Sequence, residues 1–220
     1  RIAKWNGSAW SALSTGMNSW VDALTVDATD NLYAGGDFSV AGGTTVNYLA
    51  KWNGSAWTAI GGGTSGMVAD IAFDTNGTLY VGGNFTNAGG TPANRVAKWN
   101  GTTWSALGNG MNSTVWSLAL DSNNTLYAGG DFANSGATTV NYVAKWNGTA
   151  WSKLDNGVSG GAFKCVYSLA FDSSDNLYAG GLFTSASGTA VNYIAKWNGT
   201  SWSALGGGAS ASVNDLAFDG

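Results

Sequence analysis

The stretch "AKWNGSAWSAL" at residues 3–13 returns four more times with small changes, and this recurrence decides the fold. Each copy holds two tryptophans, and together the copies use ten of the twelve tryptophans in the chain. The first tryptophan recurs after 47 residues (5 to 52, 52 to 99, 99 to 146) and finally after 51 (146 to 197). Self-similarity at this period is typical of repeat architectures. The pairs are Trp5/Trp10, Trp52/Trp57, Trp99/Trp104, Trp146/Trp151 and Trp197/Trp202.

Each repeat divides into four short β-strands, which we number by their order in the repeat. The first strand reads V-x-x-L-x-x-D, as in "VDALTVD" at 21–27, with copies at 68–74, 115–121, 166–172 and 213–219. The second is "LYAGGDF" at 32–38, with copies at 79–85, 126–132 and 177–183. The third and fourth carry the two tryptophans, as in "YLAKWN" at 48–53 and "AWSAL" at 9–13. Bulky and small residues alternate along the first strand, so one face of each sheet is large and the other small.

The connecting segments support strands rather than helices. Asn-Gly follows the first tryptophan of every pair and predicts a type I′ hairpin between the third and fourth strands. Segments such as "DATDN" join the first and second strands and are typical of side-chain-stabilised turns. Four antiparallel strands in a repeat of this length indicate a β-propeller blade. We therefore predict an all-β chain that forms one β-propeller domain over residues 1–220, with five blades of about 47 residues each.

The double glycine in "NLYAGG", followed by a strand ending in an aromatic residue and then by "W-S-x-L", resembles the kelch-type repeat. The same pattern is similar to repeats of secreted bacterial propellers and of fungal cell-surface polarity markers. The resemblance covers the whole chain and implies blade architecture, but it implies little about chemistry because kelch-like propellers include both enzymes and adaptors. The chain has no His and no Glu, so no catalytic residue is carried over.

The repeat count is uneven at the two ends. The sequence holds five first, third and fourth strands but only four second strands, so the blade formed by the two ends is incomplete. Three explanations remain open. The polypeptide continues past Gly220, another molecule supplies the strand, or the ring has more than five blades. Self-association through the incomplete blade is therefore one expected partner interaction.

Composition excludes several classes of partner. The net charge is −4, only 10% of residues are charged, and no Lys/Arg cluster could follow a phosphate backbone, so nucleic acid is not expected. No apolar run approaches the roughly 18 residues of a membrane span. The single Cys165 excludes a disulfide within the chain. Few lysines and many Ser, Thr, Asn and Gly residues favour an extracellular or cell-surface protein.

Most repeated residues are expected to be structural. The tryptophans are predicted to pack between blades, with a row of sugar-stacking platforms as the alternative. The repeated lysines are predicted to pair with Asp37, with Asp131 or with solvent, and the last Asp of each first strand to accept backbone N–H bonds. Calcium at "DATDN" or "DSSDN" is the alternative for these turns, although they lack a dense series of oxygen ligands. The N-x-[ST] sequons that recur with the repeat are explained by the hairpin turn. The repeated lysines mentioned above are Lys4, Lys51, Lys98, Lys145 and Lys196.

Binding residues are sought where near-identical repeats differ. The position after the first-strand valine is Asp, Ala, Trp, Tyr or Asn, and the loops before it also vary. In a propeller this position lies around one mouth of the central channel. Ordinary surface drift is the alternative. The candidate ligand-binding rim is an aromatic pair with polar neighbours and comprises Asp22, Asp70, Trp116, Tyr167, Asn214 and Asp215.

Catalysis has little support in the sequence. Without His or Glu the chain lacks the usual general base and ordinary zinc ligands, and Cys165 has no His partner. An aspartate pair such as Asp70 and Asp215 is the remaining option for glycoside hydrolysis. We predict no catalytic residues, no metal and no cofactor. The predicted function is a non-catalytic scaffold or interaction module, with a multivalent carbohydrate-binding lectin as the alternative and a glycosidase-type propeller as the third.

Overall fold

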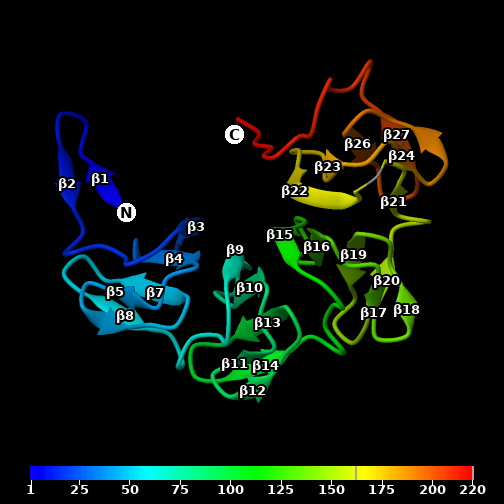
Figure 1. The fold of residues 1–220 in the computed structure, drawn as a ribbon. Coiled ribbons are helices and arrows are strands. Elements are labelled where there is room, and N and C mark those ends of the chain that lie inside the picture. Colours follow the sequence, from blue (N-terminus) through cyan, green and yellow to red (C-terminus); the bar gives the residue numbers. More distant parts are fainter. Residues whose placement is uncertain (162, 220) are drawn as a thin grey trace. The chain divides into compact units, whose positions relative to one another are not determined.

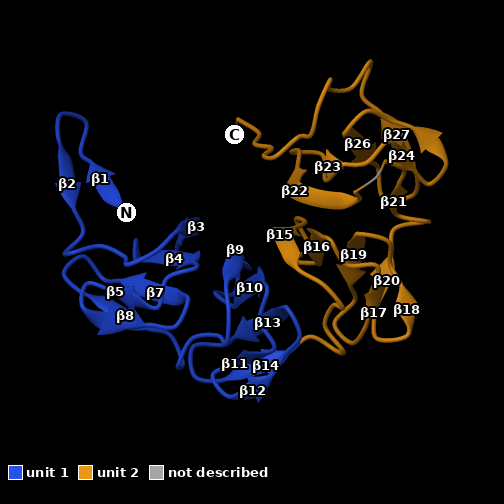
Figure 2. Ribbon diagram, in the orientation of Figure 1, with its two compact units in different colours: residues 1–106 blue, residues 107–220 orange. Residues whose placement is uncertain are grey.

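The computed structural model describes residues 1–161 and 163–219. Every regular element in this part of the chain is a β-strand, as Figure 1 shows. Consistent with this, the described residues include no helix of the length and apolar character needed to cross a membrane. The chain divides into two compact units, Arg1–Ala106 and Leu107–Gly220 (Figure 2).

Unit 1 holds two four-stranded antiparallel sheets and a separate two-stranded hairpin. In each sheet the four strands of one repeat lie in chain order, as predicted. Blade 1 consists of β3 (Val21–Val26), β4 (Leu32–Gly36), β7 (Leu49–Trp52) and β8 (Trp57–Ala59). Blade 2 consists of β9 (Val68–Phe73), β10 (Leu79–Gly83), β13 (Val96–Trp99) and β14 (Trp104–Ala106). The N-terminal hairpin consists of β1 (Ala3–Trp5) and β2 (Trp10–Ala12).

Unit 2 repeats this arrangement with two further sheets of the same strand order. Blade 3 consists of β15 (Val115–Leu120), β16 (Leu126–Gly130), β19 (Val143–Trp146) and β20 (Trp151–Lys153). Blade 4 consists of β22 (Cys165–Phe171), β23 (Leu177–Leu182), β26 (Ile194–Trp197) and β27 (Trp202–Ala204).

A short extra hairpin lies between the second and third strands of every blade and was not predicted. In blade 1 it turns at Gly42 and Gly43, whose φ angles of 57° and 84° favour glycine. A further short strand in unit 2, β21 (Val158–Ser159), pairs with β24 of the hairpin in blade 4. The hairpins are β5 (Val40–Ala41) with β6 (Thr44–Thr45), β11 (Asn87–Ala88) with β12 (Thr91–Pro92), β17 (Asn134–Ser135) with β18 (Thr138–Thr139), and β24 (Ser185–Ala186) with β25 (Thr189–Ala190).

Neighbouring blades within each unit pack through the first glycine of the pair in the second strand. A Cβ atom at Gly35 would lie 2.6 Å from Cγ1 of Val68, which belongs to the first strand of blade 2. In unit 2 a Cβ atom at Gly129 would lie 2.5 Å from Cγ1 of Val166. Both distances are too short for any side chain, so the predicted contact of a small face with a large face is confirmed, and glycine is required at it.

Residues 213–219 do not form the predicted first strand. Val213 and Leu216 nevertheless pack over Gly180 as the other first strands pack over their glycines. The backbone N–H of Leu216 donates to Ser168 Oγ at 3.0 Å, just as Leu169 donates to Ser117 Oγ at 3.0 Å. Within residues 1–219 every second strand already pairs with the first strand of its own blade, so none is left to pair with this segment. Packing on the preceding blade is therefore independent of sheet formation.

In each of the four complete blades the second tryptophan of the pair is a structural side chain, as predicted. In blade 1 the ring of Trp57 is 3% exposed, and its Nε1 donates to the carbonyl of Leu13 at 3.1 Å. The equivalent bonds reach Gly61, Leu107 and Leu154 at 3.0–3.1 Å, from Trp104, Trp151 and Trp202 respectively. The N-terminal hairpin differs, because Trp5 and Trp10 are 48% and 69% exposed.

The Asn-Gly hairpins form, but the type I′ prediction is wrong. Pairing of Trp52 with Trp57 leaves four residues in the loop instead of two. Among the described residues only Gly54 of this turn has a positive φ, at 97°. The Oδ1 atom of Asn53 instead accepts the N–H groups of Ser55 and Ala56 at 3.0 Å each. The asparagine is thus selected for its side chain, which closes the longer loop.

Candidate functional site

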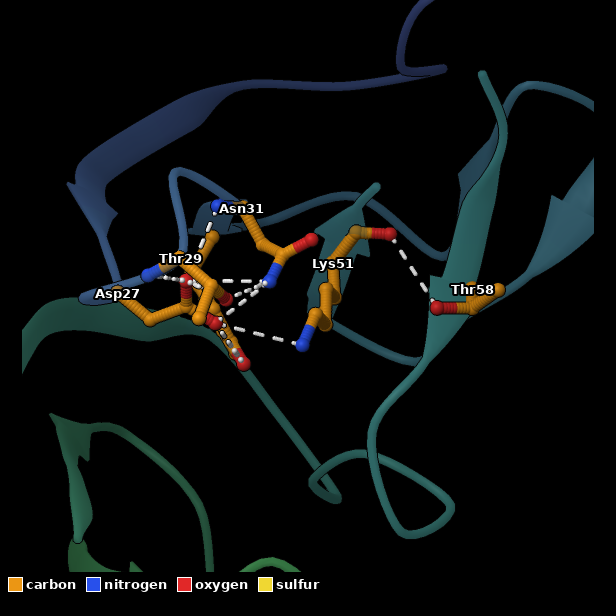
Figure 3. Close-up of polar contacts among 6 residues, drawn as sticks. Asp27, Thr29, Asn31, Lys51 and Thr58 are labelled. Carbon is orange, nitrogen blue, oxygen red and sulfur yellow. Dashed lines mark hydrogen bonds and ion pairs between the residues drawn. The ribbon is translucent and has the colours of Figure 1, made fainter. Parts of the chain in front are cut away.

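The turn between the first and second strands carries the densest polar network (Figure 3). In blade 1, Oδ1 of Asp27 accepts the backbone N–H groups of Thr29 at 2.9 Å and Asn31 at 3.0 Å. Its Oδ2 accepts from Asn31 Nδ2 at 2.9 Å, from the Tyr33 hydroxyl at 3.1 Å and from Lys51 Nζ at 3.3 Å. The prediction that this Asp accepts backbone N–H bonds is confirmed.

These bonds stabilise the ionised form of the carboxyl. Partial burial alone would raise the pKa of Asp27, but the hydrogen bonds from Asn31 and Thr29 outweigh it and hold the pKa well below its usual range. In blade 4 the same balance, with hydrogen bonds from Asn176 and Ser174, lowers the pKa of Asp172 to about 2. Both carboxylates are therefore ionised at neutral pH and fully used by the turn.

The repeated lysine joins this network, so the predicted pairing with Asp37 or Asp131 is wrong. Lys51 lies opposite Tyr33 in the sheet register, which places its Nζ 5.1 Å from the centroid of the Tyr33 ring and 3.3 Å from Asp27 Oδ2. Asp37 comes after the far end of the same second strand, out of reach of this lysine. Lys196 pairs with Asp172 in the same way, at 3.6 Å. The repeated charges therefore serve the blade.

A cleft in unit 1 lies between this turn and its counterpart in blade 2. It has a volume of about 330 Å³ and is lined by Asp27, Asp74, Tyr33 and Phe73, among others. The Asp27 carboxylate is already occupied by six donor groups, including Lys51 Nζ and the hydroxyls of Tyr33 and Thr29. Over the described ranges no three His, Cys, Asp or Glu side chains gather in a metal-binding group. The cleft therefore offers little free ligand capacity for a cation.

Of the predicted rim, Asp22 and Asp70 lie in unit 1, on the first strands of blades 1 and 2. Asp22 is exposed, and partial burial together with the neighbouring charge of Asp37 raises its pKa. Asp70 is half-buried, and its Oδ1 accepts the backbone N–H of Ile71 at 2.7 Å.

The other four rim residues lie in unit 2, where the structure brings Trp116 and Tyr167 together. Their ring centroids are 6.5 Å apart with an interplanar angle of 65°, an edge-to-face arrangement. The Nε1 atom of Trp116 is buried, and no described residue accepts its hydrogen bond. Asn214 is exposed, and Asp215 Oδ1 accepts from Ser168 Oγ at 3.3 Å. A rim formed by all six residues stays a prediction.

Two residues beside the aromatic pair were missed as site residues by the sequence analysis. Burial raises the pKa of the Cys165 thiol far above its usual range, and a hydrogen bond to Asp131 and the charge of that carboxylate add to the effect. Burial raises the pKa of Tyr167 as well, again with contributions from Cys165 and Asp131. The sequence did contain one signal for this site. Blades 1 and 3 have Asp after the glycine pair, whereas blade 4 has Leu182 there, and Leu182 lies opposite Cys165 in the sheet register.

The arrangement in unit 2 brings aromatic rings and polar groups together. Two aromatic rings lie edge to face, the Asp131 carboxylate lies close to Tyr167, and the indole N–H of Trp116 is buried. The raised pKa keeps the thiol protonated at neutral pH, and the chain contains no His that could pair with it.

The four-stranded sheets, their strand order and their stacking define a β-propeller. Residues 62–218 match the family model of the Rax2 C-terminal beta propeller domain, and the chain therefore belongs to this family. No curated protein sequence matches the chain.

Solved structures support the same fold at low sequence identity. The extracellular domains of the two-component systems BT4673 and BT3049 from B. thetaiotaomicron are 14% and 10% identical, with TM-scores of 0.51 and 0.53. The alignments cover 83% and 84% of this chain but 22% of each of those chains. An inactive variant of virginiamycin B lyase from Staphylococcus aureus is 12% identical, with a TM-score of 0.55, over 87% of this chain and 57% of the lyase. At these identities the likeness concerns the fold alone.

Proposed function

We propose that the chain is a non-catalytic propeller module that presents a binding surface, on an extracellular or cell-surface protein. The observation that carries this proposal is the contrast between repeated and varied positions. Repeated polar groups, such as Asp27 and the Trp57 indole N–H, are consumed by bonds that hold the blades. The varied positions instead bring Trp116 and Tyr167 together. The absence of His and Glu supports a binding role over an enzymatic one.

The finer architecture belongs to the same proposal. We take both units as parts of one kelch-like propeller domain with five blades of about 47 residues. Four blades are complete in residues 21–204, and the N-terminal hairpin has the sequence and pairing of the third and fourth strands of a fifth. In a closed ring the varied first-strand positions would surround the channel mouth, which is where propellers commonly bind ligands.

Carbohydrate is the second candidate ligand, and the aromatic pair of unit 2 favours it. A ring of Trp116 or Tyr167 can stack on the apolar face of a sugar, while Asp131 accepts hydroxyl hydrogen bonds. A multivalent lectin based on the repeated tryptophans has less support. In the four complete blades the second tryptophan ring is only 3–7% exposed, and its Nε1 already donates a hydrogen bond to a backbone carbonyl.

A glycan-array screen of the purified chain tests the carbohydrate proposal, with light scattering of the same sample to establish its mass. Saturable binding to one sugar family that is lost in Trp116→Ala, and kept in the control Trp20→Ala, would support it. Trp20 is a suitable control because it is 68% exposed and lies outside unit 2. A blank array from a folded sample would remove carbohydrate and leave a protein ligand as the proposal. Turnover of a glycoside that Asp70→Asn abolishes would contradict the non-catalytic assignment.

A further inference from the structure

The varied position of each complete blade is the extra residue of a β-bulge. In blade 3 the pairing register shifts between Val115 and Ser117, so the intervening Trp116 has no partner on the second strand. The same shift in blade 4 leaves Tyr167 without a partner there. A bulge redirects the side chain of its extra residue and is common beside binding sites. Every complete blade therefore keeps the bulge but changes the residue that it presents, which is Asp22, Ala69, Trp116 or Tyr167.

The two bulge residues of unit 2 form an aromatic corner. The ring centroids of Trp116 and Tyr167 are 6.5 Å apart, and the ring planes make an angle of 65°. Both residues are half-buried. The Nε1 atom of Trp116 is buried, so any part of the indole that a ligand reaches is carbon. The corner therefore presents aromatic surface to a ligand but no indole hydrogen bond.

A carboxylate lies beside this corner. Asp131 follows the second strand of blade 3 directly, and its backbone N–H donates to the carbonyl of Thr114 at 3.0 Å, close to the bulge. Burial raises the pKa of the Tyr167 hydroxyl, and the charges of Cys165 and Asp131 add to this effect. In the described part of the chain Asp131 forms no ion pair, although Lys164 precedes Cys165 in the sequence. Its negative charge therefore acts on the aromatic corner without a protein cation to balance it.

This combination suits a quaternary ammonium group better than a sugar. Such a group carries its positive charge inside a shell of alkyl carbons, so it neither donates nor accepts hydrogen bonds. Aromatic ring faces attract it through their quadrupole, and a nearby carboxylate adds charge attraction. A sugar instead needs several directed polar contacts, and the buried indole N–H of Trp116 cannot supply one.

We propose that the corner of Trp116 and Tyr167, with Asp131 beside it, binds a quaternary ammonium group of the choline type. This inference rests on the proposed binding role of the chain and names the ligand class of the same site. The two rings supply contact surface, and Asp131 supplies the balancing charge. The bulge residues of unit 1, Asp22 and Ala69, offer no ring for the same contact.

Ligand-observed NMR on the full chain tests the ligand class. Choline is compared with 3,3-dimethylbutanol, which carries the same methyl groups around a neutral carbon and is therefore a matched control without the charge. We expect saturable transfer of magnetisation from the protein to the choline methyl protons. The affinity for the neutral alcohol should be lower by about tenfold or more, because it gains neither the cation–π nor the carboxylate attraction. Equal affinity for the two compounds would overturn the proposal.

Two chain variants test the corner and the carboxylate separately. Trp116→Ala should abolish choline binding, and its fold should persist by far-ultraviolet circular dichroism because Ala69 occupies this bulge position in blade 2. Asp131→Asn should weaken choline binding about fivefold, the effect of one unit charge close to the ligand in water. Asp37→Asn is the matched control, because Asp37 follows the second strand of blade 1 and donates its N–H to Trp20 at 3.0 Å in the same way. Parent-like binding by Asp131→Asn, or an equal loss in Asp37→Asn, would overturn the proposal.

A vesicle assay identifies the source of the ammonium group. Phosphatidylcholine vesicles are compared with phosphatidylglycerol vesicles by co-sedimentation with the chain. Binding of free choline alone assigns a soluble ligand, and additional binding to phosphatidylcholine vesicles that Trp116→Ala removes assigns a lipid headgroup. No binding to choline or to either vesicle would overturn the proposal, and glycan binding that Trp116→Ala removes would then retain the binding module with a different ligand. Failure of the proposed function itself has another signature, which is glycoside turnover that Asp70→Asn abolishes.

Discussion

The N-terminal hairpin and the third and fourth strands of blade 1 share the phrase "AKWNGSAW" and have the same internal geometry. The rings of Trp5 and Trp10 lie 5.4 Å apart at 47°, and those of Trp52 and Trp57 lie 5.3 Å apart at 49°. Their surroundings differ sharply. Trp10 is 69% exposed, whereas Trp57 is 3% exposed.

This difference separates local from tertiary effects. The hairpin and its ring pair follow from sequence alone, because the turn and the pairing register are the same in both places. Burial follows from the preceding repeat, whose Leu13 carbonyl accepts the Trp57 indole N–H. Trp10 has no preceding repeat in residues 1–220 on which to pack. The same hairpin sequence can therefore contribute much or little to stability, depending on whether a preceding repeat packs against it.

The largest expected effect is on the tryptophans themselves. Trp57→Ala should lower the free energy of unfolding by ~3–5 kcal/mol, because it removes a fully buried ring and leaves a cavity. Trp10→Ala should change it by less than about 1 kcal/mol, since most of that ring is already in water. Urea denaturation followed by far-ultraviolet circular dichroism measures both. Similar losses for the two variants would contradict the comparison.

The glycine contact between blades 1 and 2 should be nearly as sensitive. Gly35→Val adds atoms where a Cβ would already lie 2.6 Å from Val68, so a loss of ~1–3 kcal/mol or more is expected from overpacking. Gly207→Ala is the control, because a Cβ at that position meets nothing within 4 Å. Thermal unfolding of the two variants should show a clear decrease for the first only. An unchanged midpoint for Gly35→Val would show that the blades do not pack through this strand.

The aspartate turns should make stability depend on acid pH. The folded pKa of Asp172, about 2, lies below the unfolded value of about 3.9. Its contribution is therefore fully present above the unfolded pKa and is lost as the pH falls from about 4 to about 2. Asp172→Asn should be less stable than the parent at pH 7, and the difference in urea midpoint should shrink across that window. Asp155→Asn, an exposed control in the same unit, should leave the urea midpoint at pH 7 close to that of the parent.

The smallest expected effect concerns the lysines. Lys51→Ala removes a half-exposed ion pair with Asp27 and should cost less than about 1 kcal/mol. Lys4→Ala should cost nothing measurable, because the N-terminal hairpin is a two-stranded sheet without the first-strand Asp and second-strand Tyr that meet Lys51 in blade 1. The two variants are compared by urea denaturation at low salt and in 1 M NaCl, where screening should reduce the Lys51 effect. Equal effects at both lysines would show that the network adds nothing to the blade.

The sequence alone predicted the four-stranded blades because tryptophan, glycine and turn residues recur at fixed positions, each with a physical requirement. It did not predict the hairpin of β5 and β6, whose two-residue strands are too short to show an alternation pattern. It placed the lysine partner at Asp37 because the register, which determines the pairing with Asp27, was not known. A strand at 213–219 was expected from local sequence, but a strand requires a partner.

The candidate site was only partly predictable. Trp116 and Tyr167 could be found because they occupy the position where otherwise similar repeats differ, and the structure brings the two rings together. Asp131 was concealed by belonging to a repeated motif, and Cys165 by preceding the strand pattern. Their proximity to Tyr167 depends on how blades 3 and 4 pack within unit 2.

Site-resolved oxidation of the tryptophans in the native chain, read by mass spectrometry, tests most directly whether the repeated phrase is buried by its neighbours. Exposed indoles should react quickly and packed ones slowly. We expect fast oxidation of Trp5 and Trp10, which are 48% and 69% exposed. We expect slow oxidation of the second tryptophan in each of the four complete blades, where these rings are 3–7% exposed. Equal rates at all five copies would show that the neighbouring repeat does not bury the ring.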